Sequence, residues 1–238
     1  MVTNRKAYED WHSRYEVDSG VDTPWHKMVI KHLQPKKDLI GKRVLEIGCG
    51  LGGFACWLAK QSERPDHIVA ADFASTAVQK GRAFAEAHNL SGITWEVADV
   101  QNIAHQDATF DTVISCETIE HVPSPKRALS ELARVLRPGG RLLLTTPNYL
   151  GTLGLYRVYL RIIGRRFTEE GQPINNFLVL PLTRRWVART GLQMRTVSAT
   201  GQYLLLPGKP PVEIPSLNHP EKIMRWVAHH SLIIAEKP

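Results

Sequence analysis

Residues 43–53 read Arg-Val-Leu-Glu-Ile-Gly-Cys-Gly-Leu-Gly-Gly, and this stretch decides the fold of the 238-residue chain. Its first half, Arg43–Ile47, is a short run of mostly apolar residues, which predicts a buried strand. The glycines that follow let the backbone turn sharply and let a ligand lie against bare main chain where a helix begins. The sequence therefore predicts a strand, a glycine-rich turn and a helix that together hold a ligand.

A regular alternation of strands and helices continues from this stretch. Further short apolar runs, bounded by Gly, Asp or Pro, predict strands at residues 67–72, 92–97, 110–115 and 140–146. Patterns with helical spacing lie at residues 53–61, 74–88 and 125–136. Because strands that alternate with helices form a parallel, doubly wound sheet, we expect an α/β fold.

The alternation breaks after Pro147. Residues 150–167 are mostly apolar but carry Arg157, Arg161 and Arg165 four apart, which on a helix makes one basic stripe. Beyond it we expect a helix at 182–190 and strands at 192–199 and 231–235.

The remaining segments define the expected domain organisation. The length suits one core, so residues 1–238 are expected to form a single domain with a cofactor-binding core at 41–146. Residues 1–40, with the aromatic residues Trp11, Tyr15 and Trp25, predict helices that lead into the first strand. Residues 147–180 and 204–228 are interpreted as insertions that cap the carboxyl edge of the sheet, where ligands bind in such folds.

Composition is that of a globular protein without a membrane span. The chain is 43% hydrophobic and 22% charged, and its apolar runs are far shorter than the ~20 residues of a spanning helix. Residues 1–10 do not resemble a signal peptide. The three cysteines form no C-x-x-C pair, which predicts neither a disulfide framework nor a zinc site. We therefore expect a cytoplasmic protein.

Charge is divided unevenly along the chain. Residues 1–150 hold 18 Lys+Arg and 18 Asp+Glu, whereas residues 151–238 hold 12 and 5, so the net charge of +7 arises after residue 150. A basic excess is typical of proteins that meet a nucleic acid, an anionic membrane surface or an acidic substrate. Such a partner is expected to meet the residues after 150.

The glycine-rich turn fits a dinucleotide at first sight. Gly48, Gly50 and Gly53 match the pattern G-x-G-x-x-G, and Asp72 follows roughly 20 residues later, where an acid that binds ribose is expected. Taken alone, this spacing predicts NAD.

Other residues favour S-adenosylmethionine. A carboxylate at Glu46 repels a pyrophosphate but suits the amino group and sulfonium of this cofactor. Asp99, at the end of the third strand, adds an acceptor for an adenine amino group. The fourth strand then ends in Ser115-Cys116-Glu117, which is no hydride-transfer site.

Five motifs in order resemble the class I S-adenosylmethionine-dependent methyltransferases. They are Val44-Leu45-Glu46-Ile47-Gly48-Cys49-Gly50-Leu51-Gly52, Asp72, Asp99, Phe110-Asp111 and Arg134-Val135-Leu136-Arg137-Pro138-Gly139-Gly140. The resemblance covers approximately residues 40–150. It implies a Rossmann-like, doubly wound sheet of seven strands whose last strand is antiparallel, and residues 231–235 fit that place.

The resemblance also implies a contact for each matching residue. These are Glu46, Gly48, Cys49, Gly50 and the Cys116 carbonyl at the methionine end, Asp72 at the ribose, and Phe73, Asp99 and the Val100 amide at the adenine. Glu117 is expected to be a further cofactor contact. The resemblance also implies that residues 1–40, with Trp11, Tyr15 and Trp25, form a helical lid that closes over the cofactor. The alternative is that these rings pack the helices onto the sheet.

A hydroxyl acceptor must lose its proton, and His121 is the best-placed base in the sequence. It ends Glu117-Thr118-Ile119-Glu120-His121, just after the fourth strand. A hydrogen-bonded structural histidine is the alternative interpretation.

The same five residues raise the question of a metal. On one helical turn, Glu117, Glu120 and His121 would come together as a partial site for Mg²⁺ or another divalent ion. With Thr146-Pro147-Asn148, this segment resembles ubiquinone-biosynthesis O-methyltransferases and small-RNA 3′-end methyltransferases. Asn175-Asn176-Phe177 stands where the RNA enzymes have a further histidine. We therefore assign no metal ligands and expect Glu120 to be a capping or salt-bridging residue.

The sequence thus predicts methyl transfer from S-adenosylmethionine to a small-molecule acceptor, with oxygen as the favoured nucleophile. Two alternatives stay open: a nucleic-acid methyltransferase that binds phosphates with its basic part, and a cofactor-binding protein without catalysis. The basic residues alternate with apolar ones and no separate RNA-binding module is visible. This favours a small acceptor of anionic or lipid-like character.

Overall fold

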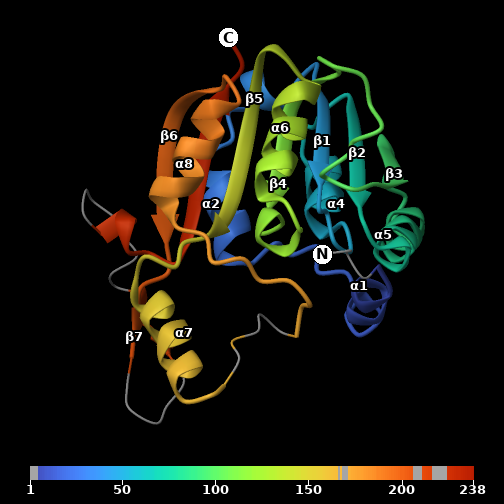
Figure 1. Ribbon diagram of the computed structural model, residues 1–238. Helices are drawn as coiled ribbons and strands as arrows, with labels where there is room; N and C mark the ends of the chain where they lie inside the picture. Colours follow the sequence, from blue (N-terminus) through green and yellow to red (C-terminus); the bar gives the residue numbers. More distant parts are fainter. Residues whose placement is uncertain (1–4, 166, 168–170, 206–210, 216–223) are drawn as a thin grey trace.

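A computed structural model describes residues 5–165, 167, 171–205, 211–215 and 224–238. At its centre is a seven-stranded sheet with the order β3-β2-β1-β4-β5-β9-β6 (Figure 1). The strands are β1 (Arg43–Ile47), β2 (His67–Asp72), β3 (Ile93–Val97), β4 (Phe110–Cys116), β5 (Leu136–Pro147), β6 (Gln193–Thr200) and β9 (His230–Glu236). β9 runs antiparallel to both β5 and β6. The predicted α/β fold with an antiparallel last strand is confirmed.

The direction of chain winding reverses between β1 and β4. The chain proceeds outward from β1 to β3, then crosses back so that β4 pairs with the other side of β1. In open α/β sheets a ligand binds at this reversal, beyond the carboxyl ends of the strands. The topology therefore places a binding site directly after β1 and β4.

Helices cover both faces of the sheet (Figure 1). They are α2 (Pro24–His32), α4 (Gly53–Lys60) and α5 (Ser75–Ala87) on one face, and α6 (Pro125–Val135) and α8 (Leu180–Arg189) on the other. Successive strand residues face opposite layers, so Val44 packs with the α2, α4 and α5 cluster while Leu45 and Ile47 pack with the α6 and α8 cluster. This two-sided burial explains why β1 reads as a nearly continuous apolar run.

Several predicted boundaries move. β5 begins at Leu136 and not near residue 140, because Leu136 already pairs with Phe110 ahead of a register irregularity. α8 begins at Leu180, earlier than expected. The short helices α1 (Arg5–His12) and α3 (Pro35–Asp38) precede β1.

The cap segments lie beyond the carboxyl edge as far as they are described. α7 (Thr152–Ile162) and the two-residue strands β7 (Tyr203–Leu204) and β8 (Val212–Glu213) extend away from the sheet at that end (Figure 1). The other parts of the predicted insertions, 166, 168–170, 206–210 and 216–223, fall outside the described residues. Within the described residues, no helix has the length and apolar character needed to cross a membrane.

Candidate functional site

A cavity of about 430 Å³ opens at the carboxyl edge of the sheet. All eleven residues predicted from the sequence as cofactor contacts or as the base line it: Glu46, Gly48, Cys49, Gly50, Asp72, Phe73, Asp99, Val100, Cys116, Glu117 and His121. They come from the ends of β1, β2 and β4 and from the segments that follow β1, β2, β3 and β4. The fold therefore brings the predicted residues into one place.

The glycine-rich turn is held open by the end of β2. Gly48 and Gly50 have φ of +74° and +53°, the left-handed region that favours glycine. A Cβ at Gly48 would overlap the Thr118 side chain. The Gly50 amide donates to Asp72 Oδ2 at 2.8 Å, so the strand that ends in this aspartate also fixes the turn.

Glu46 lies buried beneath this turn. Burial raises the pKa of its carboxyl group to about 8, and the nearby Asp72 acts in the same direction. Its Oε2 atom makes no hydrogen bond within the described residues. A buried acid with an unsatisfied oxygen is a favourable neighbour for a cationic ligand group.

Two further carboxylates extend the acidic lining toward β3. Asp72 Oδ1 accepts the Ala74 amide at 2.9 Å and lies 3.7 Å from His12 Nε2. Asp99 Oδ1 accepts the Gln101 amide at 2.8 Å. These backbone hydrogen bonds hold both side chains at the cavity wall, where the carboxylates can accept from hydroxyl or amino groups.

The segment that carries His121 differs from its prediction. It forms a single 3-10 turn, η1 (Ile119–His121), preceded by a left-handed residue, Glu117, with φ of +46°. Consequently the three side chains do not share one helical face: Glu117 contacts His230, Glu120 accepts from Thr146, and His121 Nδ1 donates to the Ile174 carbonyl at 2.7 Å. His121 Nε2 lies 3.6 Å from Glu120 Oε1. The hypothesis that one helical turn gathers them as metal ligands is wrong. The described residues contain no group of three His, Cys, Asp or Glu placed to hold a metal ion.

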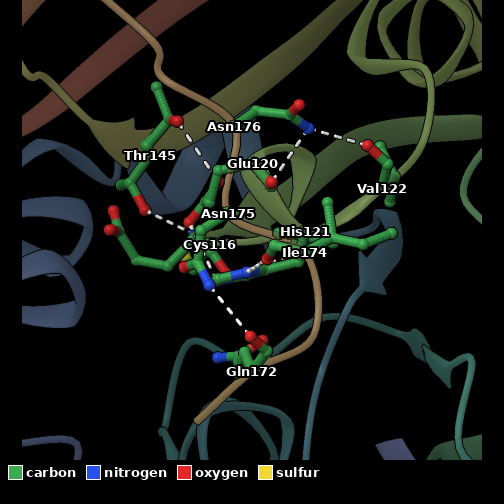
Figure 2. Close-up of polar contacts among 12 residues, drawn as sticks. Cys116, Glu120, His121, Val122, Thr145, Gln172, Ile174, Asn175 and Asn176 are labelled. Carbon is green, nitrogen blue, oxygen red and sulfur yellow. Dashed lines mark hydrogen bonds and ion pairs between the residues drawn. The ribbon is translucent and has the colours of Figure 1, made fainter. Parts of the chain in front are cut away.

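Asn176, from the stretch where the RNA enzymes have a further histidine, has a structural role. Figure 2 shows its side-chain amide directed at main-chain oxygens of the His121 segment, and it donates to the carbonyls of Glu120 at 3.0 Å and Val122 at 2.8 Å. The stretch around Ile174 thereby closes against η1 and completes the cavity wall.

The amino-terminal segment contributes more than the sequence indicated. The Glu9 carboxylate accepts the Ser75 and Thr76 amides, each at 2.7 Å, which anchors α1 at the start of α5. Tyr8 lines the cavity and donates its hydroxyl to the His121 carbonyl at 2.7 Å. α1 is therefore a wall of the cavity, and its closure over a ligand stays a prediction.

The predicted lid aromatics divide into two groups. Trp11 and Trp25 line the cavity, whereas Tyr15 is 39% exposed and its ring contacts Trp11 at a tilted angle, with ring centroids 4.7 Å apart. Only the first two can meet a ligand there.

The paired histidines His229 and His230 were not predicted from the sequence; they line the cavity at the start of β9. Residues at the start of a parallel strand lie at the edge away from the site. Because β9 is antiparallel, its first residue instead lies at the carboxyl edge of the others, beside Pro147. The signal was two adjacent histidines ahead of a strand already expected to be antiparallel.

The chain is similar to known methyltransferases. A family model described as "Methyltransferase domain" matches residues 45–144. The ubiquinone/menaquinone biosynthesis C-methyltransferase UbiE of Geobacter sulfurreducens is 32% identical over 180 residues, 70% of this chain and 69% of that protein. The ubiquinone biosynthesis O-methyltransferase of Xanthomonas euvesicatoria is 29% identical over 187 residues, 75% of each chain.

The fold is shared with solved structures. A Haloferax volcanii protein, solved with the Trm112 methyltransferase activator, superposes with a TM-score of 0.68 at 18% identity and covers 98% of this chain and 97% of that one. At this identity the likeness concerns the fold alone.

Proposed function

The chain belongs to the class I S-adenosylmethionine-dependent methyltransferases, and from that premise we propose that it methylates an oxygen nucleophile of a small-molecule acceptor. The relatives include both C- and O-methyltransferases, so the acceptor atom is the part that is proposed. One observation carries the proposal. The cavity lined by the carboxylates that are proposed to bind the cofactor is also lined by the imidazoles of His121 and His230, and each imidazole lies beside a carboxylate. An imidazole of this kind can remove a hydroxyl proton during in-line methyl transfer.

In this proposal the cofactor lies along the carboxyl edge with the contacts expected from the sequence. Glu46 attracts the amino group and the sulfonium, while Gly48, Cys49, Gly50 and the Cys116 carbonyl surround the methionine end. For the ribose and adenine the proposed contacts are Asp72, Phe73, Asp99 and the Val100 amide. The unsatisfied Glu46 oxygen and the two aspartates support this placement.

His121, the base predicted from the sequence, is one of these two candidate imidazoles. It lines the cavity, and burial lowers the pKa of its imidazole, which favours the neutral form that accepts a proton. Glu117 likewise stays a predicted cofactor contact, through its Oε1 atom, which makes no hydrogen bond within the described residues.

Titration calorimetry with S-adenosylmethionine and with NADH, followed by a methyl-transfer screen over phenols, carboxylic acids and amines, tests the proposal. We expect one S-adenosylmethionine bound per chain, no NADH binding, and transfer to oxygen acceptors. Tight NADH binding without S-adenosylmethionine binding, or transfer only to carbon or nitrogen, would contradict it.

Cofactor binding at pH 7 should release close to one proton from the wild-type protein and almost none from Glu46→Gln. With its pKa raised to about 8, Glu46 is mostly protonated in the free protein at pH 7, and a bound cation lowers that pKa again. Calorimetry in two buffers of different ionisation enthalpy measures the released protons. Equal release from wild type and Glu46→Gln would show that Glu46 does not face the cation.

The acceptor proposed here carries an anionic group and an apolar body. Arg157, Arg161 and Arg165 of α7 and its C-terminal turn line a second hollow of about 420 Å³, which shares Gln172 with the first. The Arg157 guanidinium is half-buried over the rings of three aromatic residues: Tyr149 at 4.7 Å, Phe177 at 5.3 Å and Phe167 at 5.4 Å. A partly desolvated cation next to the cavity favours an anion.

Helix α7 also supports the proposal that the acceptor has an apolar body. Five large hydrophobic side chains are exposed on α7 and its end, spaced three and four apart on one face: Leu155, Val158, Tyr159, Ile162 and Ile163. Flanked by arginines, this face suits a lipid-like acceptor or the anionic surface that holds one.

Raising the salt concentration from 0.1 to 1 M should lower kcat/KM for an anionic acceptor by about tenfold, because the Debye length falls from about 10 Å to about 3 Å. In Arg161→Gln/Arg165→Gln this salt dependence should disappear. The matched control is Arg185→Gln/Arg189→Gln, which removes two exposed arginines of equal spacing from α8. A flat profile for the wild type would reduce the α7 arginines to solvated surface.

A further inference from the structure

His230 and Glu117 form a buried imidazole–carboxylate pair in the cavity wall. His230 Nδ1 lies 3.3 Å from Glu117 Oε2, with the two side chains 9% and 15% exposed. The pair joins the start of β9 to the residue after β4, across the intervening β5. Both residues line the cavity, so the pair lies within reach of a ligand there.

The carboxylate determines which imidazole nitrogen carries the proton. Glu117 Oε2 can only accept, so Nδ1 of His230 donates to it and the neutral ring keeps its lone pair on Nε2. Within the described residues Nε2 of His230 makes no hydrogen bond. The ring is held from the side by Trp25, with ring centroids 5.2 Å apart. The result is an oriented imidazole whose acceptor nitrogen is left open by the described part of the chain.

Glu117 adopts a backbone conformation that carries a cost. Its φ of +46° lies in the left-handed region, which is unfavourable for residues other than glycine. The amide of Glu117 is held there by the Thr145 carbonyl at 3.2 Å and hydroxyl at 3.1 Å. Among the described non-glycine residues with positive φ, Glu117 is the one that lines the cavity. Strain retained at such a place is typical of a residue that positions chemistry.

The neighbouring imidazoles are less suited to the same task. The His121 ring lies between two acceptors, since Nδ1 donates to the Ile174 carbonyl and Nε2 is 3.6 Å from Glu120 Oε1. His229 is buried beside His230, and both its burial and that neighbour lower its pKa well below the usual value. Neither has the arrangement of His230, with a carboxylate on one nitrogen and no hydrogen bond from the described residues on the other.

We propose that His230 is the general base of the reaction and that Glu117 is its positioning residue. This inference rests on the proposed oxygen methylation. As the acceptor oxygen attacks the methyl carbon, Nε2 takes the hydroxyl proton. A C–O bond forms, the methyl C–S bond breaks, and its electron pair returns to sulfur as S-adenosylhomocysteine leaves. Glu117 stabilises the imidazolium that results, as a buried carboxylate does beside a catalytic histidine.

The tautomer of His230 tests the pair without any acceptor. In ¹⁵N NMR of the intact protein bound to S-adenosylhomocysteine, we expect His230 to carry its proton on Nδ1. His105, which lies outside the cavity, is an internal reference for the opposite tautomer. In His105 it is Nε2 that lies beside a carboxylate, 2.8 Å from Glu96 Oε2, so we expect Nε2 to carry the proton there. A proton on Nε2 of His230, or no change of the His230 signals in Glu117→Gln, would overturn the proposal.

Acceptor acidity provides a second test that a structural role would not pass. His230→Ala and His230→Gln should lose about a hundredfold to ten-thousandfold in kcat with phenol, whose pKa is about 10, and far less with pentafluorophenol, which is already ionised at neutral pH. Glu117→Gln should lower kcat more than it raises KM, with partial recovery in Glu117→Asp. His105→Ala is the matched control.

The outcomes separate the two claims. Equal losses with both phenols, or an unchanged rate in both His230 variants, would overturn the role of His230. If the wild type binds S-adenosylmethionine but methylates neither phenol, the phenol acceptor fails while the tautomer measurement still decides on the pair.

Discussion

Asp72→Ala should weaken S-adenosylmethionine binding by at least about a hundredfold while the protein stays folded. The variant removes the carboxylate proposed to accept from the ribose diol, and hydrogen bonds to charged groups contribute about 1.5–3 kcal/mol each. It also frees the Gly50 amide, which Asp72 Oδ2 holds at 2.8 Å. Titration calorimetry measures the affinity, and thermal melting monitors the fold.

Asp66→Ala is the matched control, because this exposed aspartate precedes β2 at the opposite edge of the sheet. We expect it to bind the cofactor like the wild type. An affinity of Asp72→Ala within about threefold of wild type would remove Asp72 from the cofactor site.

Gly50→Val should abolish cofactor binding at a small cost in stability. The only heavy atom of the described residues within 4 Å of a Cβ added at Gly50 is His12 Cε1, at 3.6 Å, so the new side chain meets little protein. It enters the cavity, where the methionine end of the cofactor is proposed to lie. The left-handed φ of +53° adds about 1–2 kcal/mol of strain. Calorimetry and thermal melting on the same sample measure the two effects.

Substitutions at two other glycines distinguish the effect of backbone strain from the effect of a side chain that blocks the cofactor site. Gly41 has φ of +70°, no described atom lies within 4 Å of a Cβ added there, and it is outside the cavity lining, so Gly41→Val should share the strain and keep cofactor binding. Gly48→Val should instead destabilise the fold strongly, because its Cβ overlaps Thr118. Normal cofactor affinity in Gly50→Val would contradict the proposed path of the ligand.

The strands at the centre of the sheet could be predicted because both their apolar composition and the residues that bound them indicate a strand. β1 and β2 are apolar runs bounded by glycine or aspartate, and the structure places both at the expected residues. The resemblance then supplied the antiparallel direction of β9, which strand composition alone does not encode. Local pattern and fold topology agree in this part of the chain.

Only part of the site could be predicted, because some of its contacts join residues that are far apart in the sequence. Residues that follow a strand directly, such as Asp72 and Asp99, could be located, because parallel strands carry their ends to one edge. The contact of Glu9 with the α5 amides and the pair of His230 with Glu117 join residues 66 and 113 positions apart. No local pattern signals such contacts.

The Glu117–His121 segment shows a second limit. Its spacing suits a helical turn, but the left-handed backbone at Glu117 and the single 3-10 turn at Ile119–His121 redirect all three side chains. Spacing predicts a shared face only where the backbone is helical. Tertiary contacts with Tyr8, Thr145 and Asn176 hold this backbone in place.

The most direct test of oxygen methylation is to identify the atom that receives the methyl group. The intact protein is incubated with S-adenosylmethionine labelled with ¹³C in the methyl group and an extract of cellular small molecules, and the products are examined by ¹³C NMR. Oxygen methylation predicts an enzyme-dependent signal in the methoxy or methyl ester region, absent with Asp72→Ala. Labelled carbon found only in C-methyl or N-methyl groups would contradict it.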